Sequence, residues 1–174
     1  MNRAVFLDRD GTLIVDAVYP KDPERVKLVP HVIEALLELQ RRFLLVIVSN
    51  QSGIGRGLIT PEEARAVHER VMQVFDREGV RFADAYYCPH APGEGCACRK
   101  PAPGMLLDAA AALGVELARS VMIGDRASDV AAGRAAGVGC LIRFGPAAGG
   151  GDDDGDARCE DWPAVRRHVS LLIE

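Results

Sequence analysis

Short apolar runs alternate along this chain with longer segments in which apolar residues recur at helical spacing. The short runs are rich in β-branched and aromatic residues, and they predict five strands, at 4–7, 44–48, 82–87, 120–123 and 138–143. The longer segments predict five helices, at 30–42, 60–78, 103–113, 127–136 and 162–173. This alternation predicts an α/β fold, a single domain built on a doubly wound parallel sheet.

Several of these boundaries carry their own signals. Thr60-Pro61-Glu62-Glu63 has the pattern of an N-cap residue, a proline at the first helical position and acids in the first turn. Gly114 and Gly137 follow two other helices, as C-terminal capping glycines do. The Gly/Asp-rich stretch 149–156 predicts a flexible, solvated loop. We find no repeat and no second domain, and therefore assign residues 1–174 to one domain.

The bulk composition is that of an ordinary globular protein, with 174 residues of which 48% are hydrophobic and 26% charged. The net charge of −4 lacks the electrostatic footprint of a nucleic-acid-binding protein, so an anionic substrate would need local cations. No stretch approaches the roughly 20 apolar residues of a membrane span. The first predicted strand begins without a signal-peptide pattern. We therefore expect a cytoplasmic protein with no nucleic-acid or membrane partner.

Polar turns follow three of the predicted strands. Asp8 and Asp10 follow the first, Ser49-Asn50 the second and Gly124-Asp125 the fourth. Because the carboxyl ends of parallel strands lie along one edge of a sheet, these residues should converge there. Asp8 and Asp10 are two positions apart, so we expect them to leave the strand in one direction and to be able to share a metal ion.

These side chains suit phosphoryl transfer from a phosphate monoester. Asp8 is a candidate nucleophile, and Asp10 a candidate acid that protonates the leaving oxygen and then accepts a proton from the hydrolytic water. Asp8 and Asp125 offer hard oxygen ligands to Mg²⁺, and Ser49 and Lys100 can hold the phosphoryl oxygens. A local alternative is that Asp125 and the acid four residues on merely cap and charge the start of a helix.

Three of the five cysteines lie within eleven residues beside a histidine. Cys88-Pro89-His90 and Cys96-Ala97-Cys98 offer three thiolates and one imidazole, a set suited to structural, tetrahedral Zn²⁺. The odd number of cysteines does not suggest a disulfide framework, and the remaining alternative is a set of small buried residues. A zinc loop over 88–98 would staple a Gly/Pro-rich segment and fix Arg99 and Lys100, which follow it directly.

The order of these motifs resembles that of the haloacid dehalogenase (HAD) superfamily. Asp8-x-Asp10-Gly11-Thr12 is similar to its first motif, Ser49 to the second, Lys100 to the third, and Gly124-Asp125-x-x-x-Asp129 to the fourth. The resemblance implies that Asp8 is the nucleophile of an aspartyl-phosphate intermediate and Asp10 the acid/base. It also implies that Mg²⁺ is held by the side chains of Asp8 and Asp125 and by the backbone carbonyl of Asp10, with Asp129 in support. The connections are too short for a cap domain, so we expect an open site and a monomer.

The chain is similar, over roughly residues 3–145, to the D-glycero-D-manno-heptose 1,7-bisphosphate 7-phosphatases. Residues 8–12, 49–57, 88–90 and 96–101 carry this resemblance. It implies Mg²⁺ and Zn²⁺ as cofactors and a small phosphorylated sugar as substrate, whose 7-phosphate is removed on the route to lipopolysaccharide or surface glycans. Ser49 and Lys100 would assist catalysis. The implied substrate contacts are Arg9, Asp16, Ala17, Val18, Tyr19, Asn50, Gln51, Ser52, Arg99 and Arg126.

Two other functions stay open. Histidinol-phosphate phosphatases belong to the same group and would use the same residues, although an arginine at position 99 favours a substrate with a second phosphate. The alternative of another class is a non-catalytic, zinc-stabilised binding module on the same scaffold. Such a module would need neither Asp8 nor Asp10, yet both are present, and it would release no phosphate from any ester.

Overall fold

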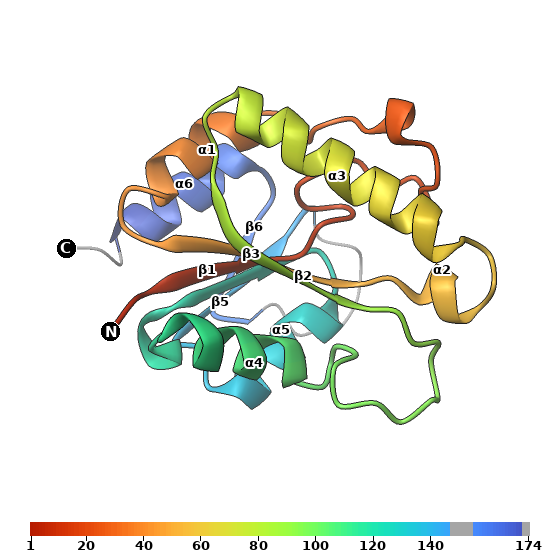
Figure 1. Cartoon of the computed structure of the whole chain (residues 1–174). Coiled ribbons are helices and arrows are strands. Elements are labelled where there is room, and N and C mark those ends of the chain that lie inside the picture. Colours follow the sequence, from red (N-terminus) through yellow and green to blue (C-terminus); the bar gives the residue numbers. More distant parts are fainter. Residues whose placement is uncertain (147–154, 172–174) are drawn as a thin grey trace.

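The computed structural model describes residues 1–146 and 155–171, and these residues form one sheet of six parallel strands (Figure 1). In chain order the strands are β1 (Ala4–Leu7), β2 (Leu44–Asn50), β3 (Phe82–Cys88), β4 (Val121–Gly124), β5 (Cys140–Phe144) and β6 (Ala157–Cys159). Across the sheet they run β3-β2-β1-β4-β5-β6, and every neighbouring pair is parallel. The order reverses between β1 and β4, the point at which doubly wound sheets bind ligands beyond the carboxyl ends of their strands.

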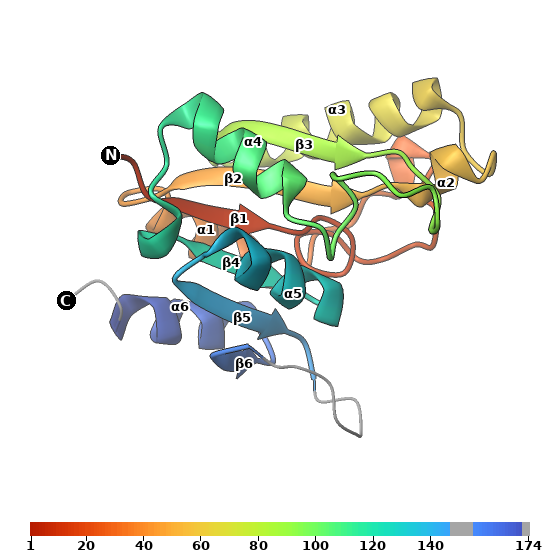
Figure 2. The ribbon, with the colours of Figure 1, turned by 90° about the horizontal axis from the view of Figure 1, so that it is seen from below.

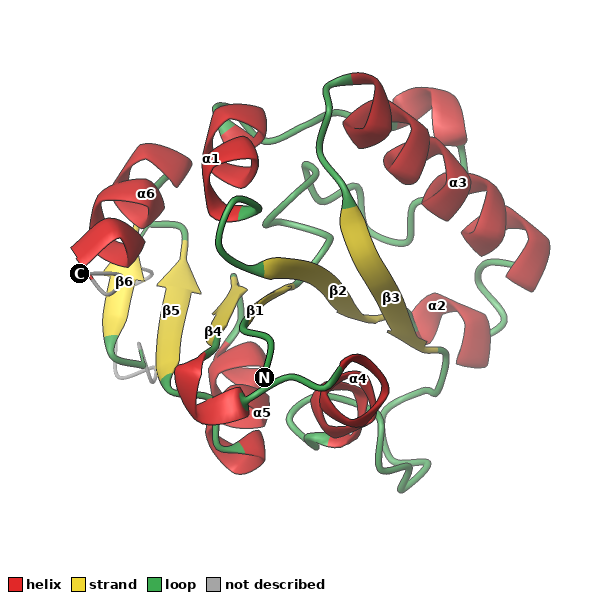
Figure 3. Cartoon of the chain, turned by 60° about the vertical axis from the view of Figure 1, so that its left-hand side comes forward, coloured by secondary structure: helices red, strands yellow, loops and turns green. Residues whose placement is uncertain are grey.

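Helices cover both faces of the sheet. On one face lie α1 (Val32–Leu39), α3 (Pro61–Arg77) and α6 (Trp162–Leu171), and on the other lie α4 (Gly104–Leu113) and α5 (Ala127–Ala136), as Figure 1 and Figure 2 show. The short helix α2 (Ser52–Gly55) follows β2 and precedes α3 (Figure 3). Two 3₁₀ turns complete the described elements, at Pro23–Arg25 and Leu117–Arg119.

The molecule has two hydrophobic cores, one between the sheet and each helical layer. Strand β1 contributes side chains to both. Val5 and Leu7 pack into the core on the side of α1, α3 and α6, whereas Ala4 and Phe6 pack into the core on the side of α4 and α5. All four side chains are fully buried. A strand that is covered on both faces needs no polar positions, and this explains the continuous apolar run in the sequence.

The predicted α/β fold is confirmed, and its capping signals are observed, although α1 spans only Val32–Leu39 of the predicted 30–42. The Thr60 hydroxyl accepts a hydrogen bond from the Glu63 N–H at 3.1 Å, and the Glu63 carboxylate accepts one from the Thr60 N–H at 2.8 Å. This reciprocal capping box starts α3, as the sequence predicts. Gly114 and Gly137 end α4 and α5 in the left-handed conformation, with φ of +62° and +80°. The described residues include no separate cap domain.

Two elements, α2 and β6, are missing from the sequence prediction, and one strand is shorter than predicted. The strand expected at 138–143 begins only at Cys140, because the Gly139 N–H donates to the Leu117 carbonyl at 3.0 Å, in the 3₁₀ segment before β4 and outside the sheet. No helix among the described residues is long and apolar enough to cross a membrane.

The segment before β6 is only partly described. Of the flexible loop predicted at 149–156, residues 149–154 lie outside the described residues, as do the last two residues of the helix predicted at 162–173. Asp156 is described, and it is bound to β5 through Leu141. The Leu141 N–H donates to the Asp156 carboxylate at 2.8 Å, and the Asp156 N–H donates to the Leu141 carbonyl at 2.8 Å. This end of the predicted loop is therefore tied to β5 by two hydrogen bonds, while Asp156 itself is exposed.

Candidate active site

A cavity of about 400 Å³ lies at the carboxyl ends of the central strands. The loop after β1 contributes Asp8 and Asp10 to it, β2 contributes Ser49 and Asn50, and the start of α5 contributes Asp129. The structure thus brings together strand ends that the sequence predicts to converge. The cavity is lined by Asp8, Asp10, Asp16, Val18, Tyr19, Pro20, Ser49, Asn50, Gln51, Ser52, Arg99, Lys100, Pro101, Arg126, Ser128 and Asp129.

Apart from the predicted zinc ligands, three of the predicted site residues do not line this cavity. Arg9 is buried, with 1% of its surface exposed, and Ala17 is exposed in the loop that follows. Asp125 lies outside the lining but within 4.8 Å of the carboxylates of Asp8 and Asp129. Conversely, the sequence prediction misses Pro20, Pro101 and Ser128. Ser128 lies between the two acids of the fourth motif, which was the only signal that could have identified it.

Asp8, Asp125 and Asp129 form a group of carboxylates whose oxygens all lie within 4.8 Å of one another. Burial raises the pKa of Asp8 well above its ordinary value; Lys100 opposes the rise, and Asp129 and Asp125 add to it. Asp125 Oδ1 is buried without a hydrogen-bond partner. Gly11 has φ of +85°, and a β-carbon there would collide with the Asp125 carboxylate. Crowded acids with an unpartnered buried oxygen fit a hard divalent cation such as Mg²⁺.

The carboxylate of Asp10 does not join this group, although it lines the same cavity. Arg9 contacts one side of it, with Nη2 at 3.1 Å from Oδ2, and the Gln51 amide donates to Oδ2 at 2.7 Å. The same Gln51 nitrogen donates to the Ser49 hydroxyl at 2.9 Å. Both carboxylates line the same cavity, but that of Asp10 is bound by Arg9 and Gln51 at the start of a turn in which three N–H groups donate to the Arg9 carbonyl. The Asp10 carboxylate is therefore not among the clustered metal-ligand candidates, and the contact that the sequence resemblance implies is that of its backbone carbonyl.

Lys100 is the buried cation of the site. Its Nζ lies 2.7 Å from Asp8 Oδ1, 2.6 Å from Asp129 Oδ1 and 2.7 Å from the Val48 carbonyl. Burial alone would lower the pKa of Lys100, but the carboxylates of Asp129 and Asp8 outweigh burial and raise it above its ordinary value. The ammonium group therefore stays charged and holds two of the three clustered acids in place.

Asp129 also has the local role that the sequence left open as an alternative. Its Oδ2 accepts a hydrogen bond from the Arg126 N–H at 2.9 Å at the start of α5, while its Oδ1 pairs with Lys100. One carboxylate thus caps a helix and orients the buried lysine. Capping and a role at the site are compatible here because the two oxygens face different partners.

Asn50 fixes the backbone of Lys100. Its Nδ2 donates to the Lys100 carbonyl at 2.9 Å, and the Lys100 N–H donates to its Oδ1 at 3.0 Å. The side chain of Asn50 thus joins the end of β2 to the segment that follows the cysteine loop. Both the oxygen and the nitrogen of the amide bond to Lys100. Asn50, predicted as a substrate contact, therefore has a structural role as well.

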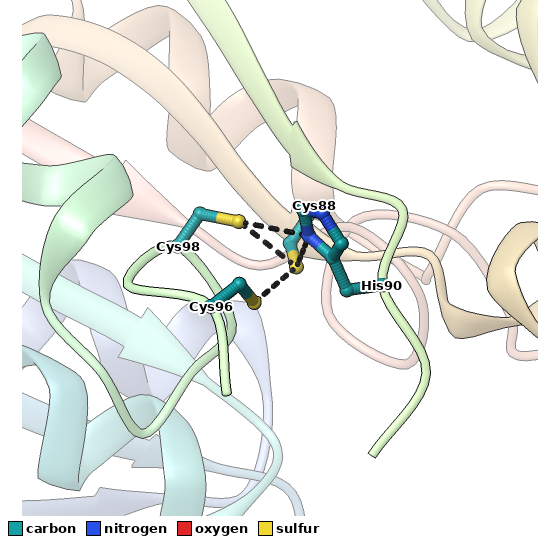
Figure 4. A group of neighbouring side chains, drawn as sticks. All are labelled: Cys88, His90, Cys96 and Cys98. Carbon is teal, nitrogen blue, oxygen red and sulfur yellow. Dashed lines mark hydrogen bonds between the residues drawn. The ribbon is translucent and has the colours of Figure 1, made fainter. Parts of the chain in front are cut away.

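The four predicted zinc ligands converge, as Figure 4 shows. Cys88 Sγ lies 3.4 Å from His90 Nδ1, 3.2 Å from Cys98 Sγ and 3.7 Å from Cys96 Sγ. The chain folds this way because Cys88 ends β3 and the Gly104 N–H donates to the Ala97 carbonyl at 3.0 Å, which ties the second cysteine pair to the start of α4. All the cysteines are free thiols. Three sulfurs and one nitrogen at these spacings fit a tetrahedral metal ion.

The cysteine loop is connected directly to the cavity. Arg99 Nη1 donates to the His90 carbonyl at 3.2 Å, and Arg99 and Lys100 both line the cavity. A change in the loop therefore acts on both cations, since they follow Cys98 in the chain.

The fold and the site define the class of HAD-like hydrolases, and the HAD-hydrolase-like family model matches residues 97–145. A crystal structure of D,D-heptose 1,7-bisphosphate phosphatase from B. bronchiseptica, complexed with magnesium and phosphate, superposes with a TM-score of 0.87. It is 32% identical, and the match covers 97% of this chain and 98% of that one.

Two sequence relatives narrow this class to a family. The D-glycero-beta-D-manno-heptose-1,7-bisphosphate 7-phosphatase of Vibrio cholerae is 45% identical over 152 residues, which is 82% of each chain. The enzyme of the same name from Haemophilus influenzae is 40% identical over 166 residues, or 90% of each chain. The chain belongs to the D-glycero-beta-D-manno-heptose-1,7-bisphosphate 7-phosphatase family.

Proposed function

We propose that this protein is a Mg²⁺-dependent phosphatase that removes the 7-phosphate of D-glycero-D-manno-heptose 1,7-bisphosphate. The observation that carries the proposal is the division of the site into two parts. Asp8, Asp125 and Asp129 surround a cation site beside Lys100, while Asp10 is held separately by Arg9 and Gln51. Lys100 favours the carboxylate form of Asp8 that a nucleophile needs, and Asp10, outside the acid group but in the same cavity, is available for proton transfer. The names of the relatives support the substrate.

In the first step, an Asp8 oxygen forms a bond to phosphorus while the bond between phosphorus and the sugar oxygen breaks. Asp10 gives its proton to that leaving oxygen. Lys100 and Ser49 donate to the phosphoryl oxygens as their charge redistributes. Asp8, Asp125 and the Asp10 carbonyl would hold Mg²⁺, whose positive charge would offset the repulsion between carboxylate and phosphate.

In the second step, water attacks phosphorus and Asp10 takes its proton. The bond between Asp8 and phosphorus breaks, which releases inorganic phosphate and restores the carboxylate of Asp8. Asp10 is thereby returned to its protonated form for the next cycle.

The cations at the mouth of the cavity favour a bisphosphate. Arg99 and Arg126 both line it, in addition to Lys100. Arg126 lies 3.3 Å from Asp16 and is largely exposed, so a substrate phosphate can replace this weak surface ion pair. Guanidinium groups suit phosphate oxygens, and histidinol phosphate has no second phosphate to occupy them.

Zn²⁺ at Cys88, His90, Cys96 and Cys98 is the second cofactor of the proposal. The four-ligand set leaves no open position, so the ion stabilises the loop and takes no part in the chemistry. A cytoplasmic monomer without nucleic-acid or membrane partners remains our prediction from sequence.

The test is inorganic phosphate release with Mg²⁺ from both anomers of the heptose bisphosphate and from histidinol phosphate, compared as kcat/KM. We expect a preference of at least about a hundredfold for one heptose bisphosphate, equal to about 2.7 kcal/mol. A preference for histidinol phosphate would move the protein to the alternative function. No release from any ester would leave only the non-catalytic binding module.

A further inference from the structure

Arg9 lies beneath the cavity and contacts Asp10 through three close atom pairs. Its Nη2 lies 3.1 Å from Oδ2 and 3.2 Å from Oδ1, and its Nε lies 3.3 Å from Oδ1. The side chain is almost completely buried. A long arginine side chain loses much rotational freedom when it is held in one position, so further contacts must fix it there.

Those contacts come from Tyr87, at the end of β3. The Arg9 guanidinium carbon lies 5.5 Å from the centre of the Tyr87 ring, which is the geometry of a cation–π contact. The Tyr87 hydroxyl oxygen lies 2.6 Å from Nδ1 of His68 in α3, and the two rings meet edge to face at 5.0 Å. Neither Tyr87 nor His68 lines the cavity.

The protonation of this pair follows from its surroundings. Burial, and then the charge of Arg9, lower the pKa of His68, so the imidazole is neutral at pH 7. Because Arg9 has no hydrogen-bond acceptor, we assign the hydroxyl proton of Tyr87 to a bond with Nδ1 of the Nε2–H tautomer, which leaves the lone pairs of the Tyr87 oxygen for the cation.

We propose that Tyr87 and His68 are positioning residues that hold Arg9 against Asp10 and so keep the Asp10 carboxylate aligned for proton transfer to the leaving group. The inference rests on the acid/base role of Asp10 in the proposed function. Gln51 restrains Asp10 from the cavity side at 2.7 Å, and the Arg9–Tyr87–His68 chain restrains it from below. If these residues served packing alone, their loss would affect all substrates equally.

The test compares substrates that differ in their need for an acid. An alkyl phosphate that the wild type hydrolyses has a poor leaving group that must be protonated. The leaving group of p-nitrophenyl phosphate, p-nitrophenolate, departs without protonation. The parameter is kcat/KM, because it reports steps up to loss of the leaving group and omits hydrolysis of the intermediate. The variants are Tyr87→Phe, which keeps the ring over Arg9, and His68→Leu, which removes the acceptor.

The controls are His68→Asn and Tyr86→Phe. His68→Asn retains a hydrogen-bond acceptor close to the position of Nδ1. Tyr86→Phe removes the same hydroxyl from the neighbouring residue of β3, which packs into the opposite core. Thermal unfolding of all four variants separates a folding defect from a misplaced acid.

General acid–base catalysis contributes roughly 10²–10⁴-fold, so we expect partial misplacement of Asp10 to cost about tenfold in kcat/KM on the alkyl phosphate. On p-nitrophenyl phosphate the change should stay within about twofold. His68→Asn should recover part of the loss, and Tyr86→Phe should behave as wild type on both substrates.

Asp10→Asn, measured in parallel, separates this inference from the function on which it rests. If Asp10→Asn loses activity selectively on the alkyl phosphate but Tyr87→Phe and His68→Leu do not, the positioning role is overturned and the acid role stands. If Asp10→Asn itself shows no such selectivity, the acid role fails and the inference fails with it.

Discussion

The side chain of Asn50 holds the backbone of Lys100 by two hydrogen bonds, of 2.9 and 3.0 Å, and its removal should disturb both stability and catalysis. The perturbation is Asn50→Ala. It deletes both bonds and frees the backbone of the lysine that pairs with Asp8 and Asp129. We expect the Lys100 ammonium to lose its fixed position while the sheet itself remains folded.

The magnitude follows from the number and burial of the bonds. A typical protein hydrogen bond contributes about 0.5–1.5 kcal/mol net, so the loss of two should lower the free energy of unfolding by about 1–3 kcal/mol. Loss of one donor to the transition-state charge costs about 10²–10³-fold in kcat. Because Lys100 is displaced and not removed, we expect a decrease of about 10–100-fold.

The chain offers a matched control in Gln40. Its amide donates to the Gly79 carbonyl at 3.0 Å and accepts from the Arg81 N–H at 2.9 Å, which is the same two-bond arrangement away from the cavity. Urea unfolding and Mg²⁺-dependent kcat are measured for Asn50→Ala and Gln40→Ala. Both variants should lose stability, and only Asn50→Ala should lose activity. Wild-type kcat in a folded Asn50→Ala variant would refute the reasoning.

Three further predictions concern other parts of the structure. Trp162→Phe removes the 3.0 Å bond from the indole to the Thr12 carbonyl behind the catalytic loop, and should lower the free energy of unfolding by about 2–4 kcal/mol in urea titrations followed by circular dichroism; an unchanged midpoint would contradict this. Cys96→Ser should lower bound zinc, thermal stability and activity together, and a metal-free, stable, fully active variant would show that zinc is not structural. Because the pKa of His68 is lowered on folding by burial and by Arg9, the unfolded chain binds its proton more readily, so stability is lost as the pH falls through the ordinary histidine range. His68→Asn should flatten that loss in unfolding measured between pH 7 and pH 5, and an unchanged slope would assign the loss to other groups.

The sequence predicts most of the fold because its strongest signals are local. The buried run of β1, the capping box of α3 and the glycines after α4 and α5 all act within a few residues. The elements that it misses depend on distant partners. Helix α2 contains two glycines in four residues, and the Gly55 N–H donates to the Pro89 carbonyl at 2.8 Å. Strand β6 has only three residues, too few for a periodic pattern.

The same distinction applies to the site. Motif order suffices to bring the acids, Lys100 and the cysteine cluster into the correct neighbourhood. It does not reveal that Arg9 is buried, because arginine is usually exposed and its burial depends on Tyr87 from another strand. Nor does spacing along a strand separate Asp10 from the other acids, since that separation depends on contacts with Arg9 and Gln51.

The claim on which the rest depends is that Asp8 becomes phosphorylated. Wild type and the variants Asp8→Asn and Asp10→Asn are mixed with Mg²⁺ and substrate, quenched in acid, and analysed by intact-mass and peptide mass spectrometry. We predict one phosphate on Asp8 in the wild type and none in Asp8→Asn. In Asp10→Asn, the fraction of phosphorylated protein should exceed that of the wild type if the substitution slows hydrolysis of the intermediate more than phosphoryl transfer. Phosphate on another residue, or wild-type turnover by Asp8→Asn, would contradict the account.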